Sequence, residues 1–280
     1  NIAKIVRKAD PNLDFTIFEI GALPLGENQE PFYQILDLFP KSRIIAFEVD
    51  EKLCNDLNSA TPSNIQYYPK ALGERTETRD FFMTAHPMCA SLFISDDKFI
   101  DLYNGLEVSR FKEKMTLDTV SIEDFAAENN IENIDFIKID IQGAELDVFK
   151  GGSGLVSKSL MIVTEVEFLP LYKGQPLFGD VSAYLSELGL MFHKFLGVAG
   201  RTLKPFVINN DPNTVSQQMW SDAVFIRNVE FVKTLSSKEL LKFALLSSLY
   251  NSVDLSLLCL QTYDDKNRTE LLNQTLKIIV

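Results

Sequence analysis

The chain has 280 residues, of which 46% are hydrophobic, so it can form the continuous core of one large α/β domain with an appendage. Its formal net charge of −12 would repel phosphate backbones and anionic headgroups, which argues against nucleic acid and membrane surfaces as main partners. The three cysteines, Cys54, Cys89 and Cys259, lie far apart without CxxC spacing, which argues against a disulfide framework or a structural zinc and favours a reduced, cytoplasmic location. No run reaches the roughly 18 apolar residues that a membrane-spanning helix needs.

Short apolar runs alternate with amphipathic stretches from residue 15 to residue 227. This alternation predicts an α/β fold, with a mainly parallel sheet whose strands are joined by crossover helices. Several runs are apolar throughout, as expected for strands covered on both faces. The predicted strands are 15–20, 43–48, 65–68, 135–140, 160–166, 190–195 and 222–227. The predicted helices lie near 30–38, 51–59, 121–129, 144–151 and 180–188.

Residues 78–99 interrupt the alternation of strands and helices with a β-like run, followed by a loop that contains His86 and Ser91. An insertion over an α/β sheet is a candidate lid or acceptor-binding loop. An edge hairpin without a chemical role explains the same pattern equally well.

After Asn228 the chain becomes a leucine-rich helical tail. Ser236 and Glu239 have the spacing of a capping box, and further helices are predicted near 254–263 and 269–279. Apolar residues cover too much of these helices for a solvated tail, so we expect them to pack on the α/β domain or on a second subunit, which would make a homo-oligomer. The sequence therefore predicts a domain of residues 1–229 and a helical extension of residues 230–280.

The first predicted strand ends at Gly21-Ala22, where a glycine lets the backbone pass close to a ligand. The next glycine is Gly26, so the spacing is not the GxGxxG of a pyrophosphate-binding dinucleotide fold. The second strand ends at Glu48-Val49, and a carboxylate there can accept both hydrogen bonds of a ribose diol. Taken alone, Gly21 could simply form a turn and Glu48 could be a solvated carboxylate without a ligand. The two residues together, on adjacent predicted strands, favour a nucleoside ligand.

Residues 134–152 place charged side chains in a strand that is otherwise apolar. Lys138 and Asp140 are two residues apart and so point to one face, where we expect them to be paired or hydrogen-bonded to each other. Glu145 lies one turn into the next helix, and Glu165 ends a neighbouring predicted strand. Four strand-end carboxylates suit a cationic sulfonium ligand with a ribose and an amine, namely Glu19, Glu48, Asp140 and Glu165.

These residues lie in segments that resemble the FkbM family of methyltransferases, in the family's order from about residue 15 to residue 228. The matching segments are FEIGA, AFEVD, PKALGE, MTLDT, IDFIKIDIQGAELDVFKGG, VTEVEFLPLYKGQPLF and SDAVFIRN. The resemblance implies a class I methyltransferase fold, S-adenosyl-L-methionine as methyl donor, and O-methylation of a sugar, glycan or natural-product hydroxyl. One departure is that Gly21 to Gly26 replaces the glycine-rich GANxG-like run of many relatives.

Carried over by position, the resemblance assigns residues to parts of the donor. Glu19, Gly21 and Ala22 belong to the donor-binding loop, and Glu48 with the adjacent Val49 belongs to the ribose. Ala71 and Leu72 belong to the adenine edge, and Asp140 to the methionine end or the reaction centre.

The implied reaction is an in-line displacement in which the protein aligns the reactants and removes the hydroxyl proton. Asp140, Glu165 and His86 are candidate bases, with Lys138 beside Asp140, whereas His193 fits a packed or edge position. A magnesium or calcium ion between Asp140 and Glu165 is conceivable, but the sequence shows no obvious local cluster and we assign no metal.

Two other functions fit part of the sequence. A nicotinamide-dependent or nucleotide-sugar-dependent enzyme would use Glu48 on its ribose, although GxGxxG is missing. A non-catalytic module that kept the methyltransferase scaffold would use the leucine-rich tail as its interaction surface.

Overall fold

The computed structural model describes residues 2–22, 30–213 and 217–279. It contains a seven-stranded sheet of order β3-β2-β1-β7-β8-β10-β9, in which each predicted strand is present. The strands are β1 (Thr16–Ile20), β2 (Arg43–Glu48), β3 (Ile65–Pro69), β7 (Phe136–Ile139), β8 (Met161–Glu167), β9 (Leu190–Phe195) and β10 (Trp220–Arg227). The strands from β3 to β8 pair in parallel, and β10 runs antiparallel to both β8 and β9. The expected Rossmann-like sheet is therefore confirmed.

A hydrophobic core covers each face of the main sheet, which explains why the strands are nearly continuous apolar runs. Ile17 joins one hydrophobic core, whereas its neighbour Phe18 joins the other. The first core includes residues of α2 (Gln34–Leu38), α3 (Glu51–Ala60) and the tail. The second includes residues of α5 (Ile122–Glu128), α6 (Glu145–Lys150), α7 (Ser153–Val156) and α8 (Phe178–Glu187). Two buried faces favour β-branched and aromatic residues throughout such a strand.

The tail helices complete the first core. They are α9 (Ser237–Leu249), α10 (Val253–Asn267) and α11 (Leu271–Ile279), and they pack with α1 (Ile2–Ala9), a helix that the sequence analysis missed. Leu245 and Leu246 are fully buried in the same core as Phe136 of the sheet. The predicted capping box is confirmed, since Ser236 Oγ accepts from Glu239 N and Glu239 Oε2 accepts from Ser236 N. The tail therefore packs on its own chain.

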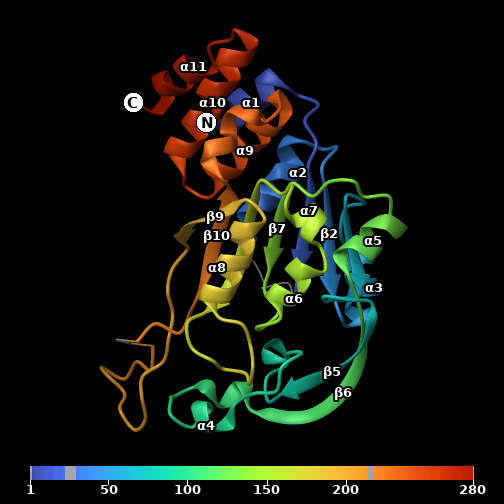
Figure 1. Cartoon of the computed structure of the whole chain (residues 1–280), viewed down its shortest axis with the longest axis vertical. Helices are drawn as coiled ribbons and strands as arrows, with labels where there is room; N and C mark the ends of the chain where they lie inside the picture. Colours follow the sequence, from blue (N-terminus) through green and yellow to red (C-terminus); the bar gives the residue numbers. More distant parts are fainter. Residues whose placement is uncertain (1, 23–29, 214–216, 280) are drawn as a thin grey trace.

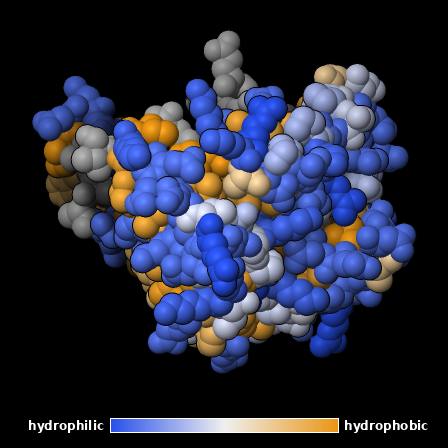
Figure 2. All heavy atoms as spheres, turned by 90° about the horizontal axis from the view of Figure 1, so that it is seen from above, coloured by the Kyte–Doolittle hydropathy of each residue, from blue (hydrophilic) through white to orange (hydrophobic). Residues whose placement is uncertain are grey.

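The tail helices lie at one end of the molecule, and the segment that contains residues 77–120 lies at the other (Figure 1). In Figure 1 the tail helices lie beyond the amino ends of the strands, whereas β5 (Glu77–Thr84) and β6 (Phe111–Val120) lie beyond the carboxyl ends. Seen from the tail end, the surface is mostly hydrophilic with scattered apolar patches (Figure 2). No helix of the described residues has the length and apolar character needed to cross a bilayer.

Residues 71–120 form a second sheet of order β4-β6-β5, with β4 at Ala71–Leu72. The β-like run predicted within 78–99 is β5, and it pairs antiparallel with β6. We did not predict β6, because most of its side chains are exposed and lack an apolar alternation. Residues 85–110 connect the two strands through η2 (Pro87–Cys89), α4 (Asp97–Ile100) and η3 (Leu106–Ser109). The insertion is thus a long hairpin at the carboxyl edge of the main sheet.

Candidate active site

Gly21 allows strands β1 and β7 to approach each other at their carboxyl ends. Its φ is +80°, and a Cβ at this position would lie 2.0 Å from the carbonyl oxygen of Asp140. Its amide and that of Ala22 both donate to the carbonyl of Phe47 on β2. A side chain would force these strand ends apart, so glycine is required by geometry. Gly26 lies outside the described residues.

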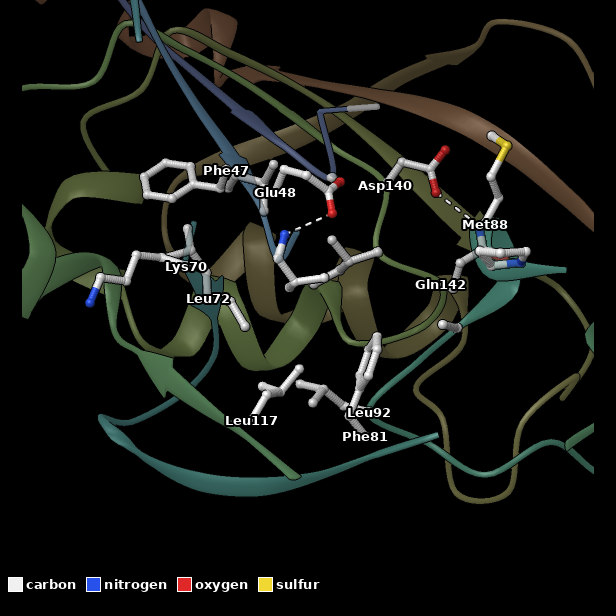
Figure 3. A pocket seen from close by; sticks show the side chains of 17 residues that line it. Phe47, Glu48, Lys70, Leu72, Phe81, Met88, Leu92, Leu117, Asp140 and Gln142 are labelled. Atoms are coloured by element: carbon white, nitrogen blue, oxygen red, sulfur yellow. Dashed lines mark hydrogen bonds between the residues drawn. The ribbon is translucent and has the colours of Figure 1, made fainter. Parts of the chain in front are cut away.

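A first pocket lies between the strand ends and the second sheet (Figure 3). Figure 3 shows Glu48 and Asp140 on one side of it and Phe81, Leu92 and Leu117 on the other. Six of the residues predicted to bind the donor line this pocket, namely Gly21, Glu48, Val49, Ala71, Leu72 and Asp140. Polar groups at one wall and apolar groups opposite are typical of a small-molecule site.

Glu48 is oriented by the backbone that follows it. Its Oε1 accepts from Val49 N at 2.8 Å and from Asp50 N at 3.2 Å. No described residue donates to Oε2, although the residue is only 8% exposed. The carboxylate is thus pre-oriented with one oxygen left for a ligand hydroxyl.

Glu19 and Ala22 are not among the residues that line the first pocket. Glu19 projects from the sheet face that carries the tail core, and Tyr33 Oη donates to its Oε2 at 2.5 Å. Burial raises the pKa of Glu19 to about 7, although the hydrogen bond from Tyr33 opposes this. Ala22 is buried in the first core.

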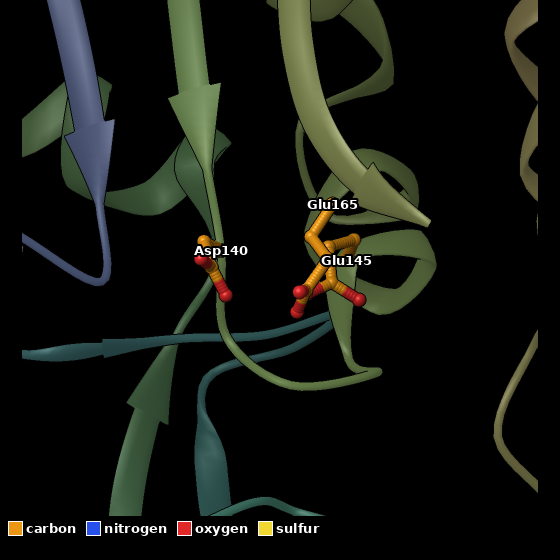
Figure 4. Close-up of side chains that lie close together, drawn as sticks. All are labelled: Asp140, Glu145 and Glu165. Carbon is orange, nitrogen blue, oxygen red and sulfur yellow. The ribbon is translucent and has the colours of Figure 1, made fainter. Parts of the chain in front are cut away.

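Three carboxyl groups converge where β7 and β8 end (Figure 4). Oxygen atoms of Asp140, Glu145 and Glu165 lie within 4.8 Å of one another. Gln142 Nε2 donates to Asp140 Oδ1 at 2.9 Å and to Glu165 Oε2 at 2.7 Å. Glu145 Oε1 accepts from Ile141 N and from Gly143 N. Hydrogen-bond donors of the chain itself therefore contact one oxygen of each of the three carboxyl groups.

Burial raises the pKa of three glutamates at these strand ends. It raises the pKa of Glu145 to about 7, and with the nearby charge of Asp140 it raises the pKa of Glu165 well above its usual range. The pKa of Glu167 is raised well above its usual range by burial and by Glu145. A carboxyl group accepts hydrogen bonds from hydroxyl groups and, when it holds a proton, also donates them, so Glu165 and Glu167 are suited to bind hydroxyl groups.

The expected pairing of Lys138 with Asp140 is wrong. Lys138 Nζ donates to Asp222 Oδ1 of β10 at 2.9 Å, across the intervening strand β8. Burial lowers the pKa of Lys138, but the charges of Asp140 and Asp222 outweigh this effect and the pKa is raised. Lys138 is thus a fixed positive charge near Asp140, and its ion pair lies outside the two pockets described here.

A second pocket of about 390 Å³ adjoins the first, and Met88 and Gln142 line both. Glu165 and Glu167 contribute to it from β8, and Trp220 from the start of β10. Strand alternation explains this grouping, because Glu167 and Trp220 are directly paired in the antiparallel ladder and so project to one face. The volume is within the usual range for a ligand site.

The two histidines take different positions. His86 lines the second pocket from the β5–β6 hairpin, and its Nδ1 accepts from Met88 N at 3.3 Å. His193 lies on the edge strand β9, where its Nε2 is 2.8 Å from Ser252 Oγ of the tail. The predicted packed or edge position of His193 is therefore confirmed.

A family model described as the methyltransferase FkbM domain matches residues 17–190, more than half of the chain. The chain belongs to the FkbM methyltransferase family. The 2-O-methyltransferase NoeI of Sinorhizobium fredii (strain NBRC 101917 / NGR234) is 29% identical over 215 residues, which cover 72% of this chain and 82% of NoeI. This FkbM protein is an S-adenosylmethionine-dependent methyltransferase, and the class I fold expected from the resemblance is confirmed.

Two solved structures show a weak similarity to this FkbM methyltransferase. The magnesium protoporphyrin IX methyltransferase ChlM of Synechocystis PCC 6803, with bound SAM, has a TM-score of 0.37 at 10% identity, over 81% of this chain and 76% of ChlM. The N-terminal domain of EvdMO1, with SAH bound, has a TM-score of 0.35 at 12% identity, over 81% of each chain. Because both TM-scores are low, the fold is assigned from the strand order and the family match and not from these two structures.

Sequence reasoning missed four residues of this FkbM methyltransferase that shape the two pockets, namely Gln142, Tyr172, Arg201 and Trp220. Tyr172 Oη donates to Gln142 Oε1 at 3.2 Å and orients the amide. Gln142 and Tyr172 carried a usable signal, because they lie inside the KIDIQGAE and VTEVEFLPLYKGQPLF segments. Arg201 and Trp220 lie outside the segments that resemble the family.

Proposed function

We propose that this methyltransferase transfers the methyl group to a hydroxyl of a sugar or glycan acceptor held in the second pocket. The observation that carries the proposal is the shared boundary of the two pockets, since Gln142 lines both. Its amide nitrogen donates to Asp140, which lines the first pocket, and to Glu165, which lines the second. The similarity to the 2-O-methyltransferase NoeI supports oxygen as the acceptor atom.

The first pocket fits S-adenosylmethionine. Gly21 lets the ends of β1 and β7 meet at this pocket, where a Cβ would collide with the Asp140 carbonyl, and Glu48 offers a free carboxylate oxygen for the ribose. Phe47, Leu72 and Leu117 offer apolar surface for the adenine. When bound, the cofactor supplies a methyl group that is already activated on a sulfonium. The protein chiefly has to align the acceptor and remove its proton.

Asp140 is our candidate for the group that accepts the hydroxyl proton, because it borders the first pocket beside the Gln142 amide. Glu165, whose pKa burial raises, binds an acceptor hydroxyl in the second pocket. His86 closes the same pocket from the hairpin and is the alternative base. Lys138 holds positive charge near Asp140 and is a positioning residue.

The test is transfer of a labelled methyl group from S-adenosylmethionine to a panel of sugars, glycans, lipids and small hydroxylated metabolites. We expect a methyl ether on a sugar hydroxyl, with turnover strongly reduced in Asp140→Asn, which removes charge and nearly preserves shape. Full turnover of Asp140→Asn would transfer the role of base to Glu165 or His86. Labelling of lipids alone would contradict the sugar acceptor.

Glu48→Ala tests the donor pocket separately. Loss of a charged acceptor for the ribose hydroxyls should weaken binding by about 1.5–3 kcal/mol in calorimetry. Glu51→Ala, which removes an exposed carboxylate one turn further on, is the control and should bind as the wild type does. Equal affinity of all three proteins would remove Glu48 from the ribose site.

A further inference from the structure

The second pocket has an aromatic and cationic wall that the proposed chemistry does not use. Trp220, the one tryptophan of the chain, lies beneath the guanidinium of Arg201, whose Cζ is 4.9 Å from the ring centroid. Both residues line the pocket. Such stacking fixes the plane of an arginine and leaves its edge available for hydrogen bonds.

Most N–H donors of the Arg201 guanidinium have no hydrogen-bond partner among the described residues. Arg201 Nη1 donates to the Gly200 carbonyl at 2.8 Å, and this is the one hydrogen bond found for the side chain among the described residues. No carboxylate of those residues lies within 4.0 Å of it, although Arg79 and Arg110 are paired with aspartates. An arginine has five N–H donors in a fork that matches carboxylate and phosphate oxygens. In a chain with 39 acidic and 27 basic residues, a pocket arginine without an acidic partner indicates an anionic ligand.

The acids of the pocket oppose such a ligand less than ordinary carboxylates would. Glu167 is buried and Glu165 is partly buried, and desolvation together with their acidic neighbours raises the pKa of each well above its usual range. A raised pKa favours the uncharged form of a carboxyl group, which can both donate hydrogen bonds to hydroxyl groups and accept hydrogen bonds from them. The pocket thus combines groups for hydroxyls on β8 with a separate cation on Arg201.

We propose that the second pocket binds a hydroxylated, sugar-sized acceptor that carries an anionic group, a carboxylate or a phosphate, which Arg201 holds while Trp220 covers a face of the ring. The inference rests on the proposed function, because it takes this pocket as the acceptor site. It names the acceptor's charge, which the methyltransferase activity leaves open.

Trp220 provides a direct measurement, because its fluorescence reports on this pocket. The full chain, saturated with S-adenosylhomocysteine, is titrated with D-glucuronate, D-glucose 6-phosphate and D-glucose at constant ionic strength. We expect at least one anionic sugar to bind about tenfold more tightly than glucose, as one charge-assisted interaction provides. The difference between glucuronate and the phosphate identifies the anionic group. In Arg201→Gln the three sugars should bind alike.

Two variants separate recognition from long-range charge. Arg201→Lys keeps the charge without the planar fork, and should retain only part of the preference. Arg43→Gln removes the same charge at the amino end of β2, far from the pocket, and should leave the preference unchanged.

Equal binding of glucose and both anionic sugars would overturn the inference, as would a preference that survives in Arg201→Gln. Absence of binding by both anionic sugars, while S-adenosylhomocysteine still binds, would also overturn it. Failure to bind S-adenosylhomocysteine would contradict the donor site instead. The two failures are therefore distinguishable.

Discussion

At the scale of single residues, Gln142 connects the two pockets. Its φ of +61° is left-handed, a conformation that costs a residue with a Cβ about 1 kcal/mol. Its backbone carbonyl accepts from Ser91 Oγ at 2.6 Å, and its amide contacts both Asp140 and Glu165. One strained residue thus holds the hairpin and both acids in place, and strain of this kind is often found at functional sites.

Gln142 can be tested without disturbing the fold, because glycine and asparagine both tolerate its backbone conformation. Gln142→Gly removes the amide and Gln142→Asn shortens it, so neither can bridge the two acids. We expect kcat to fall at least about tenfold, as for the loss of hydrogen bonds to charged groups, with little change in donor affinity. Labelled-methyl assays and calorimetry would show this separation. A matching fall in donor affinity would contradict this prediction and show that the Gln142 amide contributes to donor binding.

Glu19 makes stability depend on pH. Its folded pKa of about 7 exceeds the ordinary 4.5, so the folded state retains a proton that the unfolded chain releases. This contribution to the free energy of unfolding is complete below pH 4.5 and is lost as the pH rises through about 7. Urea denaturation from pH 4.5 to pH 8 should therefore show a smaller loss of stability for Glu19→Gln than for the wild type. Glu51→Gln, an exposed control, should follow the wild type; the same curve for all three would contradict the assignment.

At the scale of elements, the contact between α9 and the sheet combines apolar packing with an ion pair. Lys242 Nζ contacts both carboxylate oxygens of Asp135, at 3.0 and 2.9 Å, and Asp135 is buried just before β7. Asp135 Oδ2 also accepts from Thr16 N of β1. One carboxylate thereby aligns the tail with two central strands.

The apolar part of this contact is tested by Leu246, which is fully buried on α9. Leu246→Ala should lower the free energy of unfolding by about 2–5 kcal/mol, as for other buried leucines. Leu258 lies on α10 with 40% exposure, and the same substitution there should change stability by at most about 0.5 kcal/mol. Urea denaturation measures both. Equal effects would show that α9 is not part of the core.

At the scale of the whole molecule, the tail and the site occupy opposite ends of the sheet (Figure 1). Deleting the residues after Asn228 would expose the face formed by Phe136, Met161 and Ile226. Because a monomer rarely exposes so large an apolar surface, we expect the shortened chain to aggregate or unfold. Near-ultraviolet circular dichroism and size-exclusion chromatography would show this. A soluble fragment with the wild-type spectrum would make residues 230–280 the separate extension expected from the sequence.

The sequence alone determined the seven strands of the main sheet and placed three residues of the first pocket together. Burial on both faces leaves a continuous apolar run within each strand, and parallel strands bring their carboxyl ends to one edge, so Gly21, Glu48 and Asp140 could be placed together. Only the tertiary structure decided the partner of Lys138, since Asp222 is 84 residues away and depends on the position of β10. It also decided that Arg201 and Trp220 line the second pocket, because neither the loop that carries Arg201 nor the first residue of β10 has a periodic signal for the neighbours it will meet.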